Sequence, residues 1–390
     1  MIPEGWAKVT LAEISDPRAS IRYGVVQIGA NTPGGVPIVP IKYINQIGKV
    51  PLHLASPEIE GKYKNSRVQA GDVLISVKGT IGEVGIVPSG FSGNIAREIA
   101  RIRPNGKANA EYVAYQLQAP QTQRRIKSVT VGTTRLEFSI AAVKSFEIAL
   151  PPLGEQRGIV AALKTWDHAI ETVEALIANA RAQKQALMQQ LLPQGTTPPK
   201  KRLPGFSGEW REAKLGSLAD ISKGKQKGRA SLAEDGPVPV INGGITPSGY
   251  TDHPNTSADT ITISEGGNSC GYVDLITQPF WCGGHCYALK NLQVERDYLF
   301  AVLKHRERQI MSLRVGSGLP NIQKKALSQF SIPVPPGSEQ VKIGEVAASA
   351  DKEIAAHEAQ LTALRQEKAA LMQQLLTGKR RVKLPESEVV

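Results

Sequence analysis

Residues 151–192 read PPLGEQRGIVAALKTWDHAIETVEALIANARAQKQALMQQLL, and residues 335–376 read PPGSEQVKIGEVAASADKEIAAHEAQLTALRQEKAALMQQLL. The two stretches align without a gap and share 18 identical positions of 42. The chain therefore contains two copies of one unit, and each copy ends in this stretch.

Both stretches predict a long coiled-coil helix. Apolar residues recur at alternating steps of four and three, and steps that average about 3.5 residues define a coiled-coil seam. The Pro-Pro pair and the Glu-Gln after it suit a helix start. About 38 helical residues extend roughly 57 Å, too far for one small domain to cover, so we expect each helix to pack on the other. The predicted seam residues are Ile159, Leu163, Trp166, Ile170, Val173, Ile177, Lys184, Leu187, Leu191, Ile343, Ile354, Leu361, Leu364, Lys368, Leu371 and Leu375.

Two lysines interrupt the apolar seams at equivalent positions, Lys184 and Lys368. We expect their charged ends to reach out to water where each seam is ending. The alternative is that a lone polar seam residue fixes the register or orientation of the helices at some cost in stability.

The duplication continues upstream of the helices. Residues 131–152 match residues 315–336 at the same offset of 184. Short β-branched runs such as VLISV, VGIV and TITIS lie between Gly, Pro and Asn residues, which predicts mainly β domains. Helical patterns interrupt them at residues 111–128 and 297–314. We predict six segments: a first β-rich domain (1–150), a first helix (151–192), a linker (193–208), a second β-rich domain (209–334), a second helix (335–376) and a basic tail (377–390).

Charge is spread unevenly along a chain whose formal net charge is +12. Residues 1–150 hold 18 Lys/Arg and 11 Asp/Glu, whereas residues 153–192 hold four of each. A basic globular part suggests a polyanionic partner, with nucleic acid first. No apolar run approaches the roughly 20 residues that a membrane span needs, and the N-terminus has no secretory pattern. With three cysteines, which do not make a disulfide framework, we expect a cytoplasmic protein.

The motifs resemble those of the specificity subunit of type I restriction-modification systems. The resemblance rests on PPLGEQ and PPGSEQ, on the two ALMQQLL helix ends and on LPGF-x3-W at residues 203–210, and it covers nearly the whole chain. It implies an α+β fold in which two target recognition domains, each a β-rich α/β domain, are related by pseudo-two-fold symmetry. Two long antiparallel coiled-coil helices would separate these domains.

The resemblance also implies a function. Each recognition domain would read one half of an asymmetric, bipartite target in double-stranded DNA, and the helices would set the unread spacer and dock two methyltransferase (modification) subunits. The chain itself would be non-catalytic and bind no cofactor. S-adenosylmethionine, Mg and ATP would bind to the methyltransferase subunits and to the restriction/translocase subunits. No phosphate-binding or dinucleotide-binding glycine motif contradicts this division. The alternatives are a zinc-dependent nuclease and a non-catalytic coiled-coil scaffold.

DNA contacts require cationic and polar side chains on loops that can enter a groove. In the first domain we single out a glycine-containing turn, three arginines that alternate along one strand, and the turn before the last segment. In the second domain we single out the cationic loop at residues 222–229 and several polar loop residues. The candidates are Lys78, Thr80, Arg97, Arg101, Arg103, Thr133, Thr134, Arg135, Lys223, Lys225, Gln226, Lys227, Arg229, Asn242, Asn268, Ser269, Ser317 and Asn321.

A cluster of Cys270, Cys282, His285 and Cys286 is the only part of the sequence that suggests zinc. The spacing Cys282-x3-Cys286 is loose, and a histidine directly beside Cys286 is awkward for tetrahedral ligation. We therefore expect buried thiols and no metal.

Overall fold

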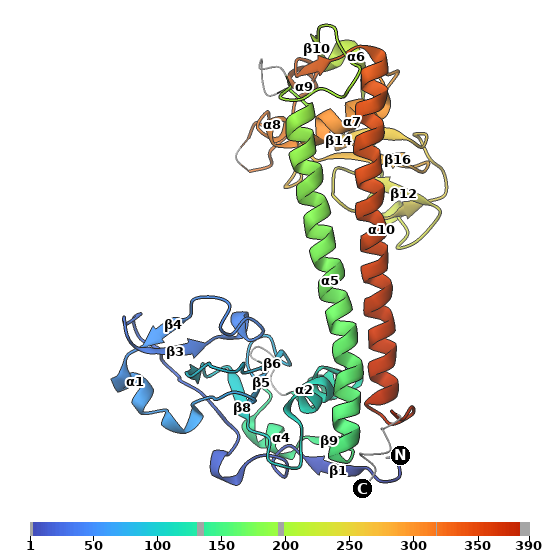
Figure 1. The fold of residues 1–390 in the computed structure, drawn as a ribbon. Coiled ribbons are helices and arrows are strands. Elements are labelled where there is room, and N and C mark those ends of the chain that lie inside the picture. The colour runs from blue at the N-terminus through green and yellow to red at the C-terminus, as the bar shows by residue number, and fades with distance from the viewer. Residues whose placement is uncertain (1–2, 131–135, 194–198, 317, 383–390) are drawn as a thin grey trace. The chain divides into compact units, whose positions relative to one another are not determined.

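A computed structural model describes residues 3–130, 136–193, 199–316 and 318–382. The chain divides into two compact units. Unit 1 comprises Met1–Thr172 and Gln360–Val390, and unit 2 comprises Val173–Ala359. Each unit thus contains one β-rich domain and one part of each long helix (Figure 1). Among the described residues, no helix is both long and apolar enough to cross a bilayer.

Unit 1 contains three small sheets. A two-stranded antiparallel sheet pairs the start of the domain with its end, a four-stranded antiparallel sheet forms the centre, and a three-stranded sheet contains one parallel pair. In sheet order, the strands are β1 (Ala7–Thr10) and β9 (Glu147–Leu150); β2 (Arg22–Tyr23), β8 (Ile99–Ile102), β5 (Val73–Ser76) and β6 (Val84–Ile86); and β4 (His53–Ala55), β3 (Val36–Val39) and β7 (Asn94–Ile95).

Unit 2 repeats this topology strand for strand. Its sheets are β10 (Arg211–Lys214) and β18 (Ser331–Val334); β11 (Asp220–Lys223), β17 (Cys286–Lys290), β14 (Thr260–Ser264) and β15 (Val273–Ile276); and β13 (Tyr250–Thr251), β12 (Val238–Ile241) and β16 (Trp281–Cys282). The interior strands β5 and β14 are buried at every residue. Burial on both faces explains why VLIS is almost wholly apolar. TITIS alternates isoleucines with small hydroxyl residues, and these hydroxyl residues are buried as well.

Short helices pack beside the sheets. In unit 1 these are α1 (Pro57–Gly61), α2 (Ala110–Gln118), α3 (Pro120–Ser128) and α4 (Ile140–Ser145). In unit 2 they are α6 (Leu215–Leu218), α7 (Arg296–His305), α8 (Glu307–Met311) and α9 (Lys324–Ser328). The helical pattern at residues 111–128 is therefore two helices, not one. Pro120 disfavours a helical Ala119, whose ψ is 136°, and so separates α2 from α3.

The two long helices are confirmed as α5 (Leu153–Leu191) and α10 (Gly337–Leu375). Every predicted seam residue is buried or half-buried. In unit 1, Asp167 of α5 contacts Lys368 of α10, while Glu155 contacts Arg381, so the two helix segments run antiparallel. In unit 2, Lys184 contacts Asp351 and Arg202 contacts Glu339, which shows the same arrangement.

Candidate nucleic-acid interface

Polar residues of unit 2 gather where β11 and β14 end. Four of the predicted residues, Lys223, Asn242, Ser269 and Asn321, line one hollow of about 560 Å³. They come from β11, from the loops after β12 and β14, and from the segment before α9. Chain folding thus brings together side chains up to about a hundred positions apart in the sequence. Ammonium, amide and hydroxyl groups on one surface are the groups that read base edges.

Glu265, which the sequence analysis did not single out, organises this hollow. Its carboxylate accepts hydrogen bonds from Lys223 Nζ at 2.6 Å and from Tyr287 Oη at 3.0 Å. Its backbone N–H donates to His285 at 2.9 Å, which holds the exposed imidazole at the edge of the hollow. Lys223 is therefore held in position by a carboxylate. A carboxylate can also accept a hydrogen bond from the amino group of cytosine.

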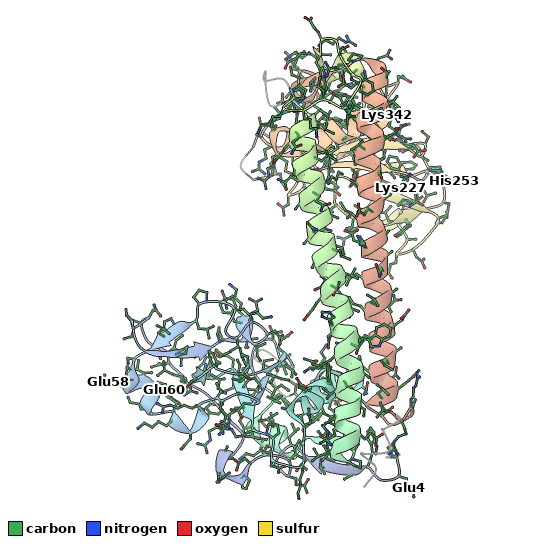
Figure 2. All side chains as sticks on the ribbon, viewed as in Figure 1. Glu4, Glu58, Glu60, Lys227, His253 and Lys342 are labelled. Carbon is green, nitrogen blue, oxygen red and sulfur yellow. The ribbon has the colours of Figure 1, made fainter. Side chains whose placement is uncertain are left out.

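The cationic loop at residues 222–229 is anchored to its neighbours. The Lys225 backbone N–H donates to Cys282, and Trp281 Nε1 donates back to the Lys225 carbonyl at 2.8 Å. Lys227, which is labelled in Figure 2, donates to Thr251 Oγ1 at 2.7 Å. Its ammonium lies 4.3 Å from the centre of the Trp281 ring. Lys225, Gln226 and Arg229 are exposed. An anchored backbone with exposed cations is suited to phosphate contacts.

A glycine permits this loop to approach β16 closely. A Cβ on Gly224 would lie 2.2 Å from the Gly283 carbonyl oxygen, which no side chain tolerates. The sequence signal for the loop, four cations with two glycines, therefore combines an electrostatic and a steric requirement.

The turn after β5 carries the candidates of unit 1. Lys78 lies 3.3 Å from Glu137 and its ammonium is 5.5 Å from the centre of the Tyr23 ring. Thr80 is exposed, and its carbonyl accepts from Ser76 Oγ at 2.5 Å. Ser76 Oγ in turn accepts from the Glu83 backbone N–H at 2.8 Å. The serine closes the turn and leaves the Lys78 and Thr80 side chains at its tip.

The three arginines near β8 do not share one exposed face, which corrects the prediction from their alternation. Arg97 is exposed, and Arg103 makes a bidentate contact with Asp72 at 2.7 Å for each bond. Arg101 is 2% exposed and donates to the carbonyls of Ser20, Asn65 and Arg67. Burial, together with the charge of Arg103, lowers the pKa of Arg101. Arg101 thus ties three loops together, and it is not accessible to DNA.

The other candidates divide into two groups. Asn268 is exposed in the loop between β14 and β15. Thr133, Thr134, Arg135 and Ser317 lie outside the described residues. The DNA-contact assignment of the accessible residues stays a prediction.

The Cys/His cluster does not form a metal site in the part of the chain that the structure describes. All three thiols are buried, and Cys270 Sγ lies against the Glu265 carbonyl at 3.1 Å. Burial raises the pKa of Cys270 and so disfavours the thiolate that zinc requires. His285 is directed to the hollow of unit 2, away from any shared ligand set.

The Glu-Gln pair of each repeated motif joins a long helix to its domain. Gln156 accepts from the Asn109 backbone N–H and donates to the carbonyls of Lys107 and Pro151. Gln340 accepts from the Glu295 backbone N–H in the same way. Asn109 and Glu295 are the caps of α2 and α7. Each glutamine therefore fixes the start of a domain helix against the start of a long helix.

The glutamates of these motifs bind arginines that follow the other long helix. The Glu155 carboxylate accepts hydrogen bonds from Arg381 Nε at 2.5 Å and from Arg381 Nη2 at 2.7 Å. It also accepts from Trp6 Nε1 at 3.0 Å. The Glu339 carboxylate accepts hydrogen bonds from Arg202 Nε at 3.0 Å and from Arg202 Nη2 at 2.5 Å. Both carboxylates are almost fully buried. Bidentate, charge-assisted contacts of this kind are strong and directional.

The seam lysines form ion pairs between α5 and α10. Lys184 Nζ is 2.5 Å from Asp351, and Lys368 pairs with Asp167. The two pairs are equivalent at the offset of 184, and all four residues are identical between the repeats. The expectation that these lysines only reach water is therefore wrong. The identity of the aspartates was a signal in the sequence that would have indicated the pairs.

In unit 1 the ion pair has a third member that the sequence analysis missed. Tyr115 Oη donates to Asp167 at 2.5 Å, and Lys368 Nζ lies 5.4 Å from the centre of the Tyr115 ring. Burial and the bond to Asp167 raise the pKa of Tyr115. The hydroxyl therefore stays protonated and donates at neutral pH.

Comparison with known proteins places both copies in one family. A family model described as "Type I restriction modification DNA specificity domain" matches residues 3–180 and residues 207–366. The EcoBI specificity subunit of a type I restriction enzyme from Escherichia coli is 32% identical over 196 residues, or 49% of this chain and 41% of that protein. The MjaVIII specificity subunit from Methanocaldococcus jannaschii is 25% identical over 394 residues, or 88% of this chain and 91% of that protein. Matches to the first of these relatives, and to two mycoplasma proteins, span less than half of their length.

Solved structures share the fold. The S subunit of a type I restriction-modification system from M. genitalium matches with a TM-score of 0.65 at 21% identity, over 96% of both chains. A chain from a study of complex assembly and conformational transition of the type I R-M system matches with a TM-score of 0.58 at 22% identity, over 97% of this chain and 100% of that chain.

Proposed function

The chain belongs to the family of type I restriction-modification DNA specificity proteins, and on that premise we propose that each of its units reads one half of a bipartite DNA target. Because the side chains at equivalent positions differ between the units, the two halves of the target would differ in sequence. The helices α5 and α10 would set the length of the unread spacer.

One observation carries this proposal: the same scaffold presents different side chains at equivalent positions. The sheet orders β2-β8-β5-β6 and β11-β17-β14-β15 are the same, and both place a turn beside the segment before α4 or α9. In unit 1, Lys78 bridges to Glu137 there, and in unit 2, Gly266 bridges to Asn321. A carboxylate only accepts hydrogen bonds, whereas an amide both donates and accepts, so the two would select different bases.

We further propose that the chain is not itself a catalyst. Methyl transfer from S-adenosylmethionine would belong to two methyltransferase subunits docked on the long helices, and ATP-driven steps with Mg would belong to restriction subunits. A cytoplasmic location follows from a target in cellular DNA. The near-neutral helices beside a basic domain support this division, because polyanion binding is concentrated in the domain.

Mapping of methylated positions tests the proposal. The full chain is co-expressed with its methyltransferase subunit in a host that lacks other DNA methylation. We expect a bipartite methylated motif that depends on the chain. Replacing residues 1–150 by those of another family member should change one half of the motif only. A change in both halves, or no chain-dependent motif, would contradict the proposal.

Single substitutions sharpen the test. Asn321→Asp should relax or change the bases read by unit 2, and Glu137→Gln should do the same for unit 1. A good bidentate base contact contributes roughly 1–3 kcal/mol of discrimination. The matched control is Gln278→Glu, the same amide-to-carboxylate change at an exposed residue between β15 and β16 that does not line the hollow, and this variant should leave the motif unchanged.

A further inference from the structure

Tyr115 fills a space beside the helix pair of unit 1. Its ring is 8% exposed, its hydroxyl donates to Asp167, and Lys368 lies against its face. Asp167 belongs to α5, Lys368 to α10 and Tyr115 to α2. One tyrosine of the domain thus joins both long helices.

Unit 2 has an alanine where unit 1 has Tyr115. Tyr112 and Tyr298 are equivalent, since each receives a cap at its backbone N–H and donates its hydroxyl to the same strand position, Ala149 or Pro333. Three residues further along α2 and α7 are Tyr115 and Ala301. Unit 2 nevertheless has the corresponding ion pair beside this position, between Lys184 and Asp351.

A hollow of about 590 Å³ lies at this position of unit 2. Ala301, Lys184 and Asp351, the counterparts of the three residues that meet in unit 1, all line it. Met188 and Ile354 add apolar wall, and Arg181 adds a cation. The hollow therefore has the features that hold Tyr115 in unit 1: a carboxylate that can accept from a hydroxyl, an ammonium that can lie on a ring face, and apolar surface.

We propose that this hollow receives a tyrosine side chain of the methyltransferase subunit that docks on unit 2, an inference that rests on the proposed function. Unit 1 shows which occupant fits, because the same ion pair there binds a phenol from the chain itself. The two units would then dock their partners differently: unit 1 would use a surface closed by Tyr115, and unit 2 an open socket.

A small phenol tests the socket without any partner. The probe is p-cresol, the side chain of tyrosine, added to the full chain. We expect saturable binding with a Kd of about 1 mM, an affinity within the reach of a ligand of this size. Toluene, which lacks the hydroxyl, should bind about tenfold more weakly. Ala301→Tyr should abolish p-cresol binding and raise the Tm, whereas Ala301→Ser should leave binding intact. Absence of p-cresol binding to the wild-type chain would overturn the proposal.

Docking is measured separately by titrating the methyltransferase subunit into the chain. Ala301→Tyr should weaken the methyltransferase at one of its sites at least tenfold, as loss of a buried tyrosine anchor does. Ala301→Ser, the matched control, should bind as the wild type does. Unchanged docking by Ala301→Tyr would overturn the proposal even if p-cresol binds. If the wild-type chain binds no methyltransferase, the proposed function fails as well, and the p-cresol result still shows whether the socket accepts phenols.

Discussion

Unit 1 and unit 2 have the same strand order, the same domain–helix joints and the same interhelix ion pair, yet they carry different residues at the turn after the central strand, Lys78 in unit 1 and Gly266 in unit 2. The joints are repeated because each must satisfy buried polar groups, as Gln156 and Gln340 do. A buried group without a partner is costly, whereas an exposed one can be exchanged. The parts that the two units share therefore form the scaffold, and the exposed parts are free to differ between the units.

The same comparison shows where the scaffold itself has diverged. Trp6 donates to Glu155, whereas the corresponding Trp210 Nε1 is buried and has no hydrogen-bond acceptor among the described residues. Val77 in unit 1 corresponds to Glu265 in unit 2, since both follow the central strand and accept from equivalent backbone positions, Phe138 and Ile322. Unit 2 has thus introduced a charged residue at a position that unit 1 keeps apolar, and this residue organises its polar hollow.

We expect the largest loss of stability when the buried glutamates Glu155 and Glu339 are replaced. Glu339→Ala should lower the free energy of unfolding by about 3 kcal/mol, because it leaves Arg202 without its partner. Glu155→Ala should cost about 1 kcal/mol more, since Trp6 Nε1 also loses its acceptor. Urea denaturation of the full chain measures both values. Glu353→Ala, at an exposed site of α10, serves as the control and should change stability by less than about 0.5 kcal/mol. Equal losses for the two glutamates would show that the tryptophan bond contributes nothing.

The two buried tyrosines should differ in the next largest effect. Tyr298→Phe removes the donor to Pro333 and should cost about 2 kcal/mol. Tyr112→Phe also removes the acceptor of a Gln116 Nε2 bond, but it should cost only about 1 kcal/mol. Gln116 still donates to the carbonyls of Ala149 and Leu376, whereas its counterpart in unit 2 is the apolar Val302. Chemical denaturation with hydrogen exchange in β9 and β18 assigns each loss to its unit. Tyr23→Phe, on an exposed ring, is the control, and a reversed order would contradict the account.

The interhelix ion pairs should contribute less. Lys368→Met should cost about 1 kcal/mol and Lys184→Met about 0.5 kcal/mol, because partly exposed pairs are weak and the hollow of unit 2 lets water reach Asp351. A charge exchange, Lys184→Asp with Asp351→Lys, should restore most of the loss. Thermal unfolding measures these changes, with Lys352→Met as the control at an exposed site of α10. Failure of the exchange to restore stability would show that the pair does not act through its charges.

The smallest effect concerns pH. Burial, with the nearby charge of Arg306, lowers the pKa of His305 below its ordinary value, and the equivalent residue in unit 1 is Ala119. Between the folded pKa and about 6.5 the unfolded chain binds more protons, so stability should fall as pH drops through this window. His305→Gln should remove this contribution, which urea denaturation at pH 7.5 and pH 5.5 detects. An unchanged pH dependence in the variant would exclude His305 as its source.

Much of the fold was predictable because its signals are local and repeated. The seam of α5 and α10 follows from steps of four and three residues, and the β-rich domains follow from runs such as VLIS and TITIS. The site was predictable only in part. Alternation correctly indicated that residues near β8 are strand-like, but it could not show that Arg101 is covered by the loops that carry Ser20, Asn65 and Arg67.

The sequence by itself determined the duplication, the two long helices and the division between a basic first domain and near-neutral helices, since each is a property of composition or of spacing along the chain. Only the tertiary structure decided the partners: Arg381 for Glu155, Arg202 for Glu339, and Asp351 for Lys184. These residues lie more than 130 positions apart, and their contacts depend on how the antiparallel helices align. The repeated stretch specifies that its two copies pair. Three-dimensional packing places Tyr115 against the ion pair of unit 1 and leaves a hollow beside the ion pair of unit 2.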